Sequence, residues 1–173
     1  MYHTTPITII AVDPGYERIG IAVMEKGSAG KEIVLHSECF TTSSKKPFTE
    51  RLHEIGSRFS ALIADHKPSI LAIENLFMQN NQKTAMRVAE VRGALIYLAK
   101  HAGLEIHEFT PKEIKLAVTG NGSAHKSDIA FMIPKLIAVS LDKKIDDEID
   151  ALAVGITCFA YKKTVSTYPQ KNT

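Results

Sequence analysis

The 173-residue sequence lacks the features that mark several common classes of protein. Its two cysteines, Cys39 and Cys158, stand far apart without a C-x-x-C pair, so we expect neither a zinc site nor a disulfide framework. The expected setting is a reducing cytosol. The apolar run 7–12 is too short for a secretory signal and has no basic segment before it. The longest later apolar run, 151–161, is about half of the ~20 residues that span a bilayer. We therefore expect a cytoplasmic protein with no membrane partner.

The sequence also lacks a strong excess of charge of either sign. The formal net charge is +2 and the pI is near 8.5, so any affinity for nucleic acid must come from local basic patches. No glycine-rich phosphate loop, internal repeat or long linker is present. A chain of this length buries roughly 70% of the surface that its unfolded form exposes. We expect one domain over 1–163 and a disordered tail over 164–173.

The apolar pattern predicts an α/β fold. Three strands in antiparallel meander order are expected at 7–12, 20–24 and 33–40, and two further strands at 69–73 and 105–109. Helices are expected from Phe48 to just before Pro68, over 82–102, from Thr110 to Gly120, over 127–139 with a bend at Pro134, and from Asp146 or Asp147 onward. The order of these elements predicts a five-stranded mixed sheet flanked by helices.

Acidic residues stand at the ends of several predicted elements. Asp13 and Glu74 each follow a buried strand, and Asp147 and Asp150 are three residues apart at the start of the last helix, so they share one helical face. Asp146 and Asp150, four residues apart, share a face equally well. Carboxylates brought together repel unless cations lie among them, and hard oxygen ligands suit Mg²⁺ or Mn²⁺. Two such ions about 4 Å apart can hydrolyse a phosphodiester.

Each acid also has a plain structural explanation when it is taken alone. Asp13 before Pro14 and Gly15 is a common turn residue, and Glu74 can be a solvated strand end. Acids at a helix start are usually capping groups. A shared metal site is favoured because three acidic sites stand at element ends in a chain whose pattern indicates a single sheet.

Several stretches of the sequence together resemble the RuvC family of bacterial Holliday junction resolvases. They are D-P-G-Y-E-R-I-G (13–20), I-E-N-L-F (73–77), V-R-G-A (91–94), T-P-K-E-I-K-L-A-V-T-G-N-G-S-A-H-K (110–126) and D-E-I-D-A-L-A (147–153). Their order and spacing match from about residue 7 to residue 160. The resemblance implies a ribonuclease H-like fold, a homodimer, and paired symmetric nicking of four-way DNA junctions in recombination and repair.

The resemblance also implies a cofactor, a partner complex and a set of site residues. The cofactor would be Mg²⁺, two ions per active site, with Mn²⁺ as a substitute, and the partner a branch-migration motor of the RuvA–RuvB type. The implied metal-binding catalytic acids are Asp13, Glu74, Asp147 and Asp150, and Phe77 is the implied aromatic residue that stacks on a base. Lys115 and Lys126 are the implied basic residues of the active site, whose ammonium groups would hold the scissile backbone or offset its developing charge. Charge and neighbourhood alone add Lys83, Arg87, Arg92 and Lys112 as DNA-binding candidates.

The sequence departs from the family pattern at three positions near the motifs. His125 stands where relatives commonly have an acid, Tyr16 replaces a usual aliphatic residue, and Ile19 replaces a common threonine. Because the charge of histidine changes near pH 6.5, His125 is a candidate influence on the pH dependence beside Lys126.

Three other functions are compatible with parts of the pattern. One is a ribonuclease H-like nuclease that acts on RNA or other branched DNA. Another is a sugar kinase or actin-like ATPase, whose fold also opens with an acid and a glycine after the first strand, although the chain has little room for its second half. The last is a non-catalytic junction-binding module, which gains nothing from concentrated acids because DNA is a polyanion.

Overall fold

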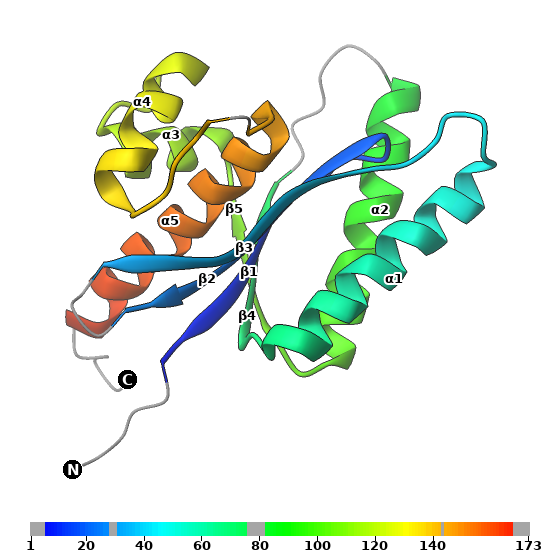
Figure 1. Ribbon diagram of the computed structural model, residues 1–173, viewed down its shortest axis with the longest axis horizontal. Coiled ribbons are helices and arrows are strands. Elements are labelled where there is room, and N and C mark those ends of the chain that lie inside the picture. The colour runs from blue at the N-terminus through cyan, green and yellow to red at the C-terminus, as the bar shows by residue number, and fades with distance from the viewer. Residues whose placement is uncertain (1–5, 28–30, 76–81, 143, 168–173) are drawn as a thin grey trace, which may run out of the picture.

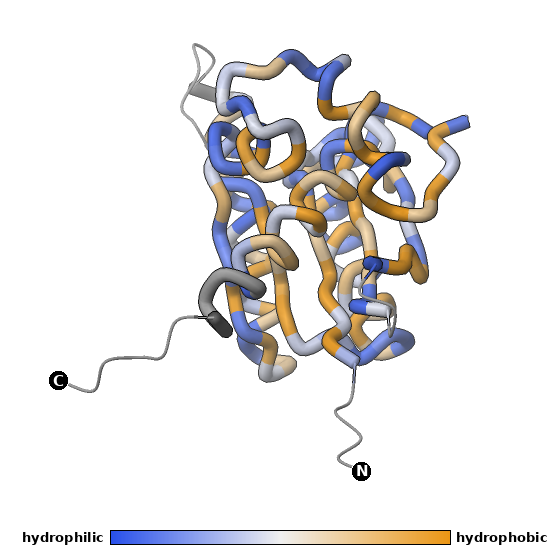
Figure 2. Tube along the Cα trace, turned by 90° about the vertical axis from the view of Figure 1, so that its left-hand side faces the viewer, coloured by the Kyte–Doolittle hydropathy of each residue, from blue (hydrophilic) through white to orange (hydrophobic). Residues whose placement is uncertain are grey.

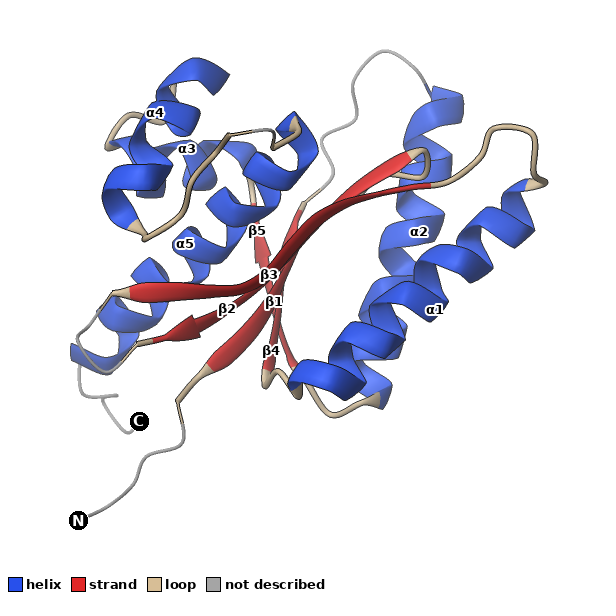
Figure 3. Ribbon diagram, viewed as in Figure 1, coloured by secondary structure: helices blue, strands red, loops and turns tan. Residues whose placement is uncertain are grey.

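The computed structural model describes residues 6–27, 31–75, 82–142 and 144–167 (Figure 1). Its centre is one five-stranded sheet of strand order β3-β2-β1-β4-β5. The strands are β1 (Thr8–Asp13), β2 (Arg18–Lys26), β3 (Glu32–Thr41), β4 (Ile70–Glu74) and β5 (Glu105–Phe109). β1, β2 and β3 pair antiparallel, whereas β1 with β4 and β4 with β5 pair parallel (Figure 3). The mixed five-stranded sheet predicted from the sequence is confirmed.

Helices cover both faces of the sheet. They are α1 (Phe48–His66), α2 (Gln82–His101), α3 (Pro111–Thr119), α4 (Lys126–Leu136) and α5 (Asp146–Thr167). Helices α1 and α2 cover one face, and α5 covers the other with α3 and α4 packed beside it (Figures 1 and 3). The predicted capping box starts α3, with the Thr110 side chain bonded to the N–H of Glu113 and the Glu113 carboxylate bonded to the N–H of Thr110.

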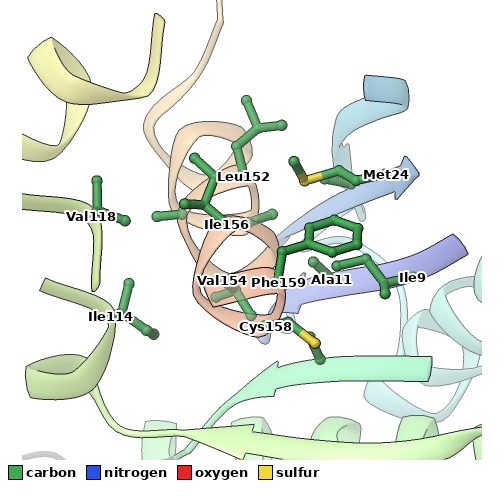
Figure 4. Packing of buried hydrophobic residues seen from close by; sticks show 14 of the residues in the cluster. Ile9, Ala11, Met24, Ile114, Val118, Leu152, Val154, Ile156, Cys158 and Phe159 are labelled. Atoms are coloured by element: carbon green, nitrogen blue, oxygen red, sulfur yellow. The ribbon is translucent and has the colours of Figure 1, made fainter. Parts of the chain in front are cut away.

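The alternation of the strands decides which side chains face which helices. Ile9 and Ala11 of β1 pack in the core beneath α5, whereas Ile10 and Val12 pack against α1 and α2. The central strands consist mainly of apolar residues, whereas apolar and hydrophilic residues alternate along the helices (Figure 2). Figure 4 shows α5 between the strands and α3, with Leu152, Phe159 and other apolar side chains around it. Asp13, two residues after Ala11, therefore belongs to the α5 face.

Some predicted boundaries differ from those in the structure. β2 begins at Arg18 instead of residue 20, because its pairing with β3 extends as far as Arg18, which pairs with Thr41. α4 ends at Leu136 instead of 139, with Pro134 in its last turn, because the backbone of Ile137 is extended and ends the helix. α5 runs to Thr167, four residues into the segment expected as a tail, and 168–173 lie outside the described residues. Among the helices described, none combines the length and apolar character that crossing a membrane requires.

A glycine in β2 allows the start of α5 to approach the sheet. Gly20 pairs with Asp13, and a Cβ at Gly20 would lie 1.8 Å from the carbonyl oxygen of Asp147. Real side chains do not tolerate this distance, so any larger residue must displace the first turn of α5. Because that turn carries two of the candidate acids, Gly20 controls how near they come to the end of β1.

Replacing Gly20 with alanine tests this close approach. Gly20→Ala should lower the free energy of unfolding by about 1–3 kcal/mol, because the added methyl overpacks a backbone contact. Gly93→Ala is the matched control, since Gly93 is exposed in the middle of α2 with nothing within 4 Å of an added Cβ. That substitution should raise the free energy of unfolding by about 0.5–1 kcal/mol. Urea unfolding followed by circular dichroism measures both, and an unchanged midpoint for Gly20→Ala would contradict the account.

Candidate active site

Asp13 and Glu74 are brought together by the parallel pairing of β1 and β4. Val12 pairs with Ile73, so the residues that follow, Asp13 and Glu74, end neighbouring strands at the same edge of the sheet. Both lie on the face that α5 covers. The carboxyl groups of Asp13 and Glu74 hydrogen bond to each other. The sequence prediction that these two acids converge is therefore supported by the geometry.

The two carboxyl groups cannot both be charged without a large electrostatic cost. Burial, and after it the nearby charges of Glu74 and Asp150, raise the pKa of Asp13 to about 8. Burial also raises the pKa of Glu74, although its hydrogen bond to Asp13 and the charges of Lys126 and Lys115 act in the opposite direction. At neutral pH the pair therefore shares a proton, with the Asp13 carboxyl donating to Glu74.

The first turn of α5 contributes two further acids, and each has a basic partner. Asp147 Oδ2 lies 3.2 Å from Nε of Arg18, and the Lys126 Nζ lies 2.7 Å from Oδ2 of Asp150. Asp147 and Asp150 both act on the pKa of Asp13. Both carboxylates are therefore near enough to the strand ends to join Asp13 in one cluster.

Asp146 lies on a different side of the helix start. It is exposed, and its charge contributes to the raised pKa of Lys126 after the larger effects of Asp150 and Asp13. It does not figure among the groups that raise the pKa of Asp13, whereas Asp147 does. Of the two spacings that the sequence leaves open, the geometry favours Asp147 with Asp150.

A pocket of about 300 Å³ lies over the acids. Its lining residues are Asp13, Glu74, Pro111, Ile114, Lys115, Lys126, Ile129 and Asp150. Three acids thus face two lysines, which come from α3 and α4. This arrangement can hold a phosphodiester between positive side chains while the carboxylates face it from the sheet.

The donor set of this pocket fits Mg²⁺ or Mn²⁺ in its chemistry. The converging groups are carboxylate oxygens, which hard divalent cations prefer, and a cation would replace the proton shared by Asp13 and Glu74. Within the described ranges, however, no three acidic, histidine or cysteine side chains are already arranged as a metal site. Oδ2 of Asp150 and Oδ2 of Asp147 pair with Lys126 and Arg18, so a cation at this site would compete with these two side chains for the carboxylates.

The remaining DNA-binding candidates occupy different environments. Arg87 lies over the ring of Phe48 at 4.1 Å and pairs with Glu90 at 2.9 Å, with its side chain 41% exposed. Arg92 is mostly buried; it pairs with Glu108 and donates from Nε to the carbonyl oxygen of Glu74 at 3.3 Å. Arg92 therefore braces the end of β4, and its role in DNA binding stays a prediction.

Lys112 and Lys83 are also on helices near the pocket end of the sheet, and Phe77 follows β4. Lys112 is exposed in the first turn of α3. Lys83 lies in the first turn of α2, but its side chain is outside the described part of the chain. Phe77 lies outside the described residues altogether, so its role stays a prediction.

Two groups near the pocket were not anticipated from the sequence. The first is Arg18, which pairs with Asp147. The second is a partly buried cluster in which Ser37 Oγ donates to Glu148 at 2.6 Å, and Lys144 donates to Ser37 at 2.9 Å and also to Glu148. This cluster fastens the first turn of α5 to β3. Arg18 could have been found from the sequence, because it stands two residues before Gly20 in β2 and so shares its face of the sheet. Nothing local in the sequence predicts the contact of Ser37 with Glu148.

Comparison with known proteins identifies similar sequences over nearly the whole chain. A profile of the family described as crossover junction endodeoxyribonuclease RuvC matches residues 9–158. A protein of that name from Mycobacterium avium is 36% identical over 148 residues, which are 86% of this chain and 79% of the relative. Another from Geobacter sp. is 34% identical over 158 residues, 91% of this chain and 94% of the relative.

A solved structure is also similar in fold. The RuvC of T. thermophilus in complex with a Holliday junction substrate superposes with a TM-score of 0.85 at 27% identity, covering 92% of this chain and 97% of that chain. The ribonuclease H-like fold that the sequence resemblance implied is confirmed by this match.

The shared proton between Asp13 and Glu74 predicts how stability depends on pH. The pKa of Asp13 rises on folding from 3.8 to about 8, so its favourable contribution is complete below pH 3.8 and is lost as the pH approaches about 8. In EDTA, the Tm of the native protein should fall between about pH 5 and about pH 8, and that of Asp13→Asn should fall less. Asp146→Asn, which removes an exposed acid at the start of α5, is the control and should behave like the native protein. Equal falls for Asp13→Asn and the native protein would contradict the burial of this charge.

Proposed function

Because the chain belongs to the RuvC family of crossover junction endodeoxyribonucleases, we propose that it resolves four-way DNA junctions at the pocket formed by Asp13, Glu74 and Asp150. The observation that carries the assignment of the pocket is the group of largely buried, mutually repelling carboxylates at the ends of β1 and β4. Folding gains nothing from such a group. A site that binds cations and cleaves phosphodiesters requires it.

The acids are proposed to hold two Mg²⁺ ions, with Mn²⁺ as a substitute. Asp13 and Glu74 would supply oxygens from the strands, and Asp147 and Asp150 would supply oxygens from α5. Bound Mg²⁺ supplies the site with activation of water and with neutralisation of charge on the phosphodiester. The chain itself contributes a fixed strand end, because Arg92 donates to the Glu74 carbonyl oxygen, and a fixed helix start, because Gly20 permits the approach of Asp147.

Lys115 and Lys126 are proposed to hold the DNA backbone in the pocket. Both line it, and both lower the pKa of Glu74 by their charges. The Lys126 side chain is 71% exposed, so its ammonium can exchange Asp150 for a phosphate oxygen without losing a buried contact. Positive groups placed there also stabilise the negative charge that develops when the phosphodiester is cleaved.

Paired symmetric cuts require two active sites, and we propose a homodimer that uses α2. One pocket cuts one strand, and a twofold axis relates two equal cuts. Met86 and Tyr97 on α2 are 66% and 68% exposed, and Tyr97 also lines an open groove of about 500 Å³ between α1 and α2. Large exposed side chains beside a groove suit contact with a second copy of the same surface.

The wider setting is part of the same proposal. A junction endonuclease acts in recombination and repair of chromosomal DNA, which in bacteria takes place in the cytoplasm. A motor complex of the RuvA–RuvB type would move the junction before it is cut. These partners are inferred from the family and not from a surface of this chain.

A nicking assay tests the function directly. The native protein should nick a labelled immobile four-way junction in Mg²⁺, on two strands of like polarity, and should leave a matched linear duplex intact. Asp147→Asn should slow cutting by roughly 10³-fold, because several kcal/mol of electrostatic stabilisation depend on the cluster. Asp146→Asn, the adjacent acid, should cut at the native rate.

Four results would contradict the proposal or one of its parts. Equal cutting of the linear duplex would remove the junction selectivity, and cutting of RNA or flapped DNA in preference to the junction would favour another ribonuclease H-like nuclease. Full activity in EDTA would exclude the proposed dependence on a divalent cation. A larger loss in Asp146→Asn than in Asp147→Asn would assign the helix ligand to Asp146.

The dimer surface is tested by placing charge on α2. Tyr97→Arg should shift the protein from dimer to monomer in sedimentation velocity, because two like charges would meet across a twofold axis. The variant should nick single strands but should no longer couple the two cuts. Lys31→Ala, which changes one exposed charge remote from α2, should remain dimeric. A native protein that sediments as a monomer at all concentrations would contradict the proposed dimer.

A further inference from the structure

Arg18 points to the same face of the sheet as the acidic pocket. Residues two apart in a strand share a face, so Arg18 lies on the face of Gly20, and Gly20 pairs with Asp13. The start of α5 covers this face, and Nε of Arg18 lies 3.2 Å from Oδ2 of Asp147. A guanidinium group is therefore held directly beside the acids, although it does not line the pocket.

The ion pair between Arg18 and Asp147 is open to exchange. The Arg18 side chain is 56% exposed, and that of Asp147 is 20% exposed. Solvent screens a pair of this kind, so the pair contributes little to stability. A guanidinium also binds phosphate oxygens well, because its planar N–H groups match their spacing. Arg18 can therefore leave Asp147 for a phosphate at little cost to the fold.

The opposite flank of the pocket carries a second pair of the same kind. Lys126 pairs with Asp150 at 2.7 Å and lines the pocket beside α3, which follows β5 directly. In the sheet, β2 and β5 lie on opposite sides of β1. Each flank therefore presents one exposed basic side chain that neutralises one carboxylate of α5.

We propose that Arg18 contacts the DNA backbone on the β2 flank of the pocket, after release from Asp147. This inference rests on the proposed function, because it places DNA over the pocket. The exchange keeps the charges balanced: Arg18 passes from a carboxylate to a phosphate, and the carboxylate of Asp147 becomes available to a divalent cation. The backbone is then held on both flanks of the scissile phosphate, by Arg18 on one side and by Lys126 on the other.

The salt dependence of junction binding tests this contact without any cutting. Fluorescence anisotropy with a labelled immobile four-way junction, in Ca²⁺ in place of Mg²⁺ so that a divalent cation is present without cutting, should show weaker binding for Arg18→Ala. The slope of log K against log salt concentration is negative, and each lost phosphate contact makes it less steep by about 0.9. From 50 to 200 mM salt, the native protein should therefore lose about 3.5-fold more affinity than Arg18→Ala for each subunit that engages the DNA. Arg18→Lys should keep the native slope, because it retains the charge.

Lys31→Ala is the matched control. Lys31 is exposed before β3, at the other end of the β2–β3 pair, and the nine residues of β2 separate the two ends by about 26 Å. This variant should bind with the native affinity and slope. Thermal melting should show that Arg18→Ala remains folded; should it unfold, Arg18→Gln takes its place in the comparison.

The outcomes separate this inference from the proposed function. If Arg18→Ala shows the native slope, whatever its affinity, the proposed phosphate contact is overturned. A folding defect alone would weaken binding but leave the slope unchanged, because it removes no charge from the interface. If the native protein binds the junction no better than a linear duplex, the proposed function fails whatever Arg18 does. Junction preference together with a native slope in Arg18→Ala would refute the role of Arg18 alone.

Discussion

The site depends on one electrostatic constraint, which is that several carboxylates lie together in a largely buried place. Asp13 is at the centre of this constraint, because its burial and, after it, the charges of neighbouring acids raise its pKa to about 8. In the free protein the repulsion is relieved by a proton shared with Glu74 and by two basic side chains, Arg18 and Lys126, which pair with the acids of α5. Divalent cations would relieve it in another way, by replacing the shared proton and the positive charges of Arg18 and Lys126, which could then bind DNA phosphates. Relief of the same repulsion thus links cation binding to DNA binding.

The scaffold resists this repulsion by fixing the acids from several directions. The parallel pairing of β1 with β4 sets the spacing of the two strand ends. The carbonyl of Glu74 is braced by Arg92, and the first turn of α5 is fastened to β3 by the partly buried cluster of Glu148 with Ser37 and Lys144. After this first turn, the apolar residues of α5 pack between the sheet and α3 (Figure 4). The acids are therefore placed by ordinary core packing that continues under the pocket.

The sequence predicted the fold and the strand-end acids because these depend on local patterns. Continuous apolar runs identified the strands, and the Thr110 capping box identified the start of α3. The alternatives at Asp146 and Asp147 could not be separated from the sequence, because both spacings share a helical face and only the position of α5 against the sheet distinguishes them. The same limit applied to Arg92, because its contacts with Glu108 and with the carbonyl oxygen of Glu74 could not be predicted from its charge. Contacts between residues far apart in the chain determine such roles.

The most direct test of the central claim is a crystal structure of the protein soaked with Mn²⁺, with anomalous scattering used to locate the ion. The account predicts a peak between the carboxylates of Asp13 and Glu74, at about 2.0–2.4 Å from their oxygens, with Asp147 or Asp150 turned from its basic partner toward the ion. Saturating Mn²⁺ that leaves Asp13 and Glu74 unligated, while ions occupy only exposed acids such as Asp146, would contradict the account.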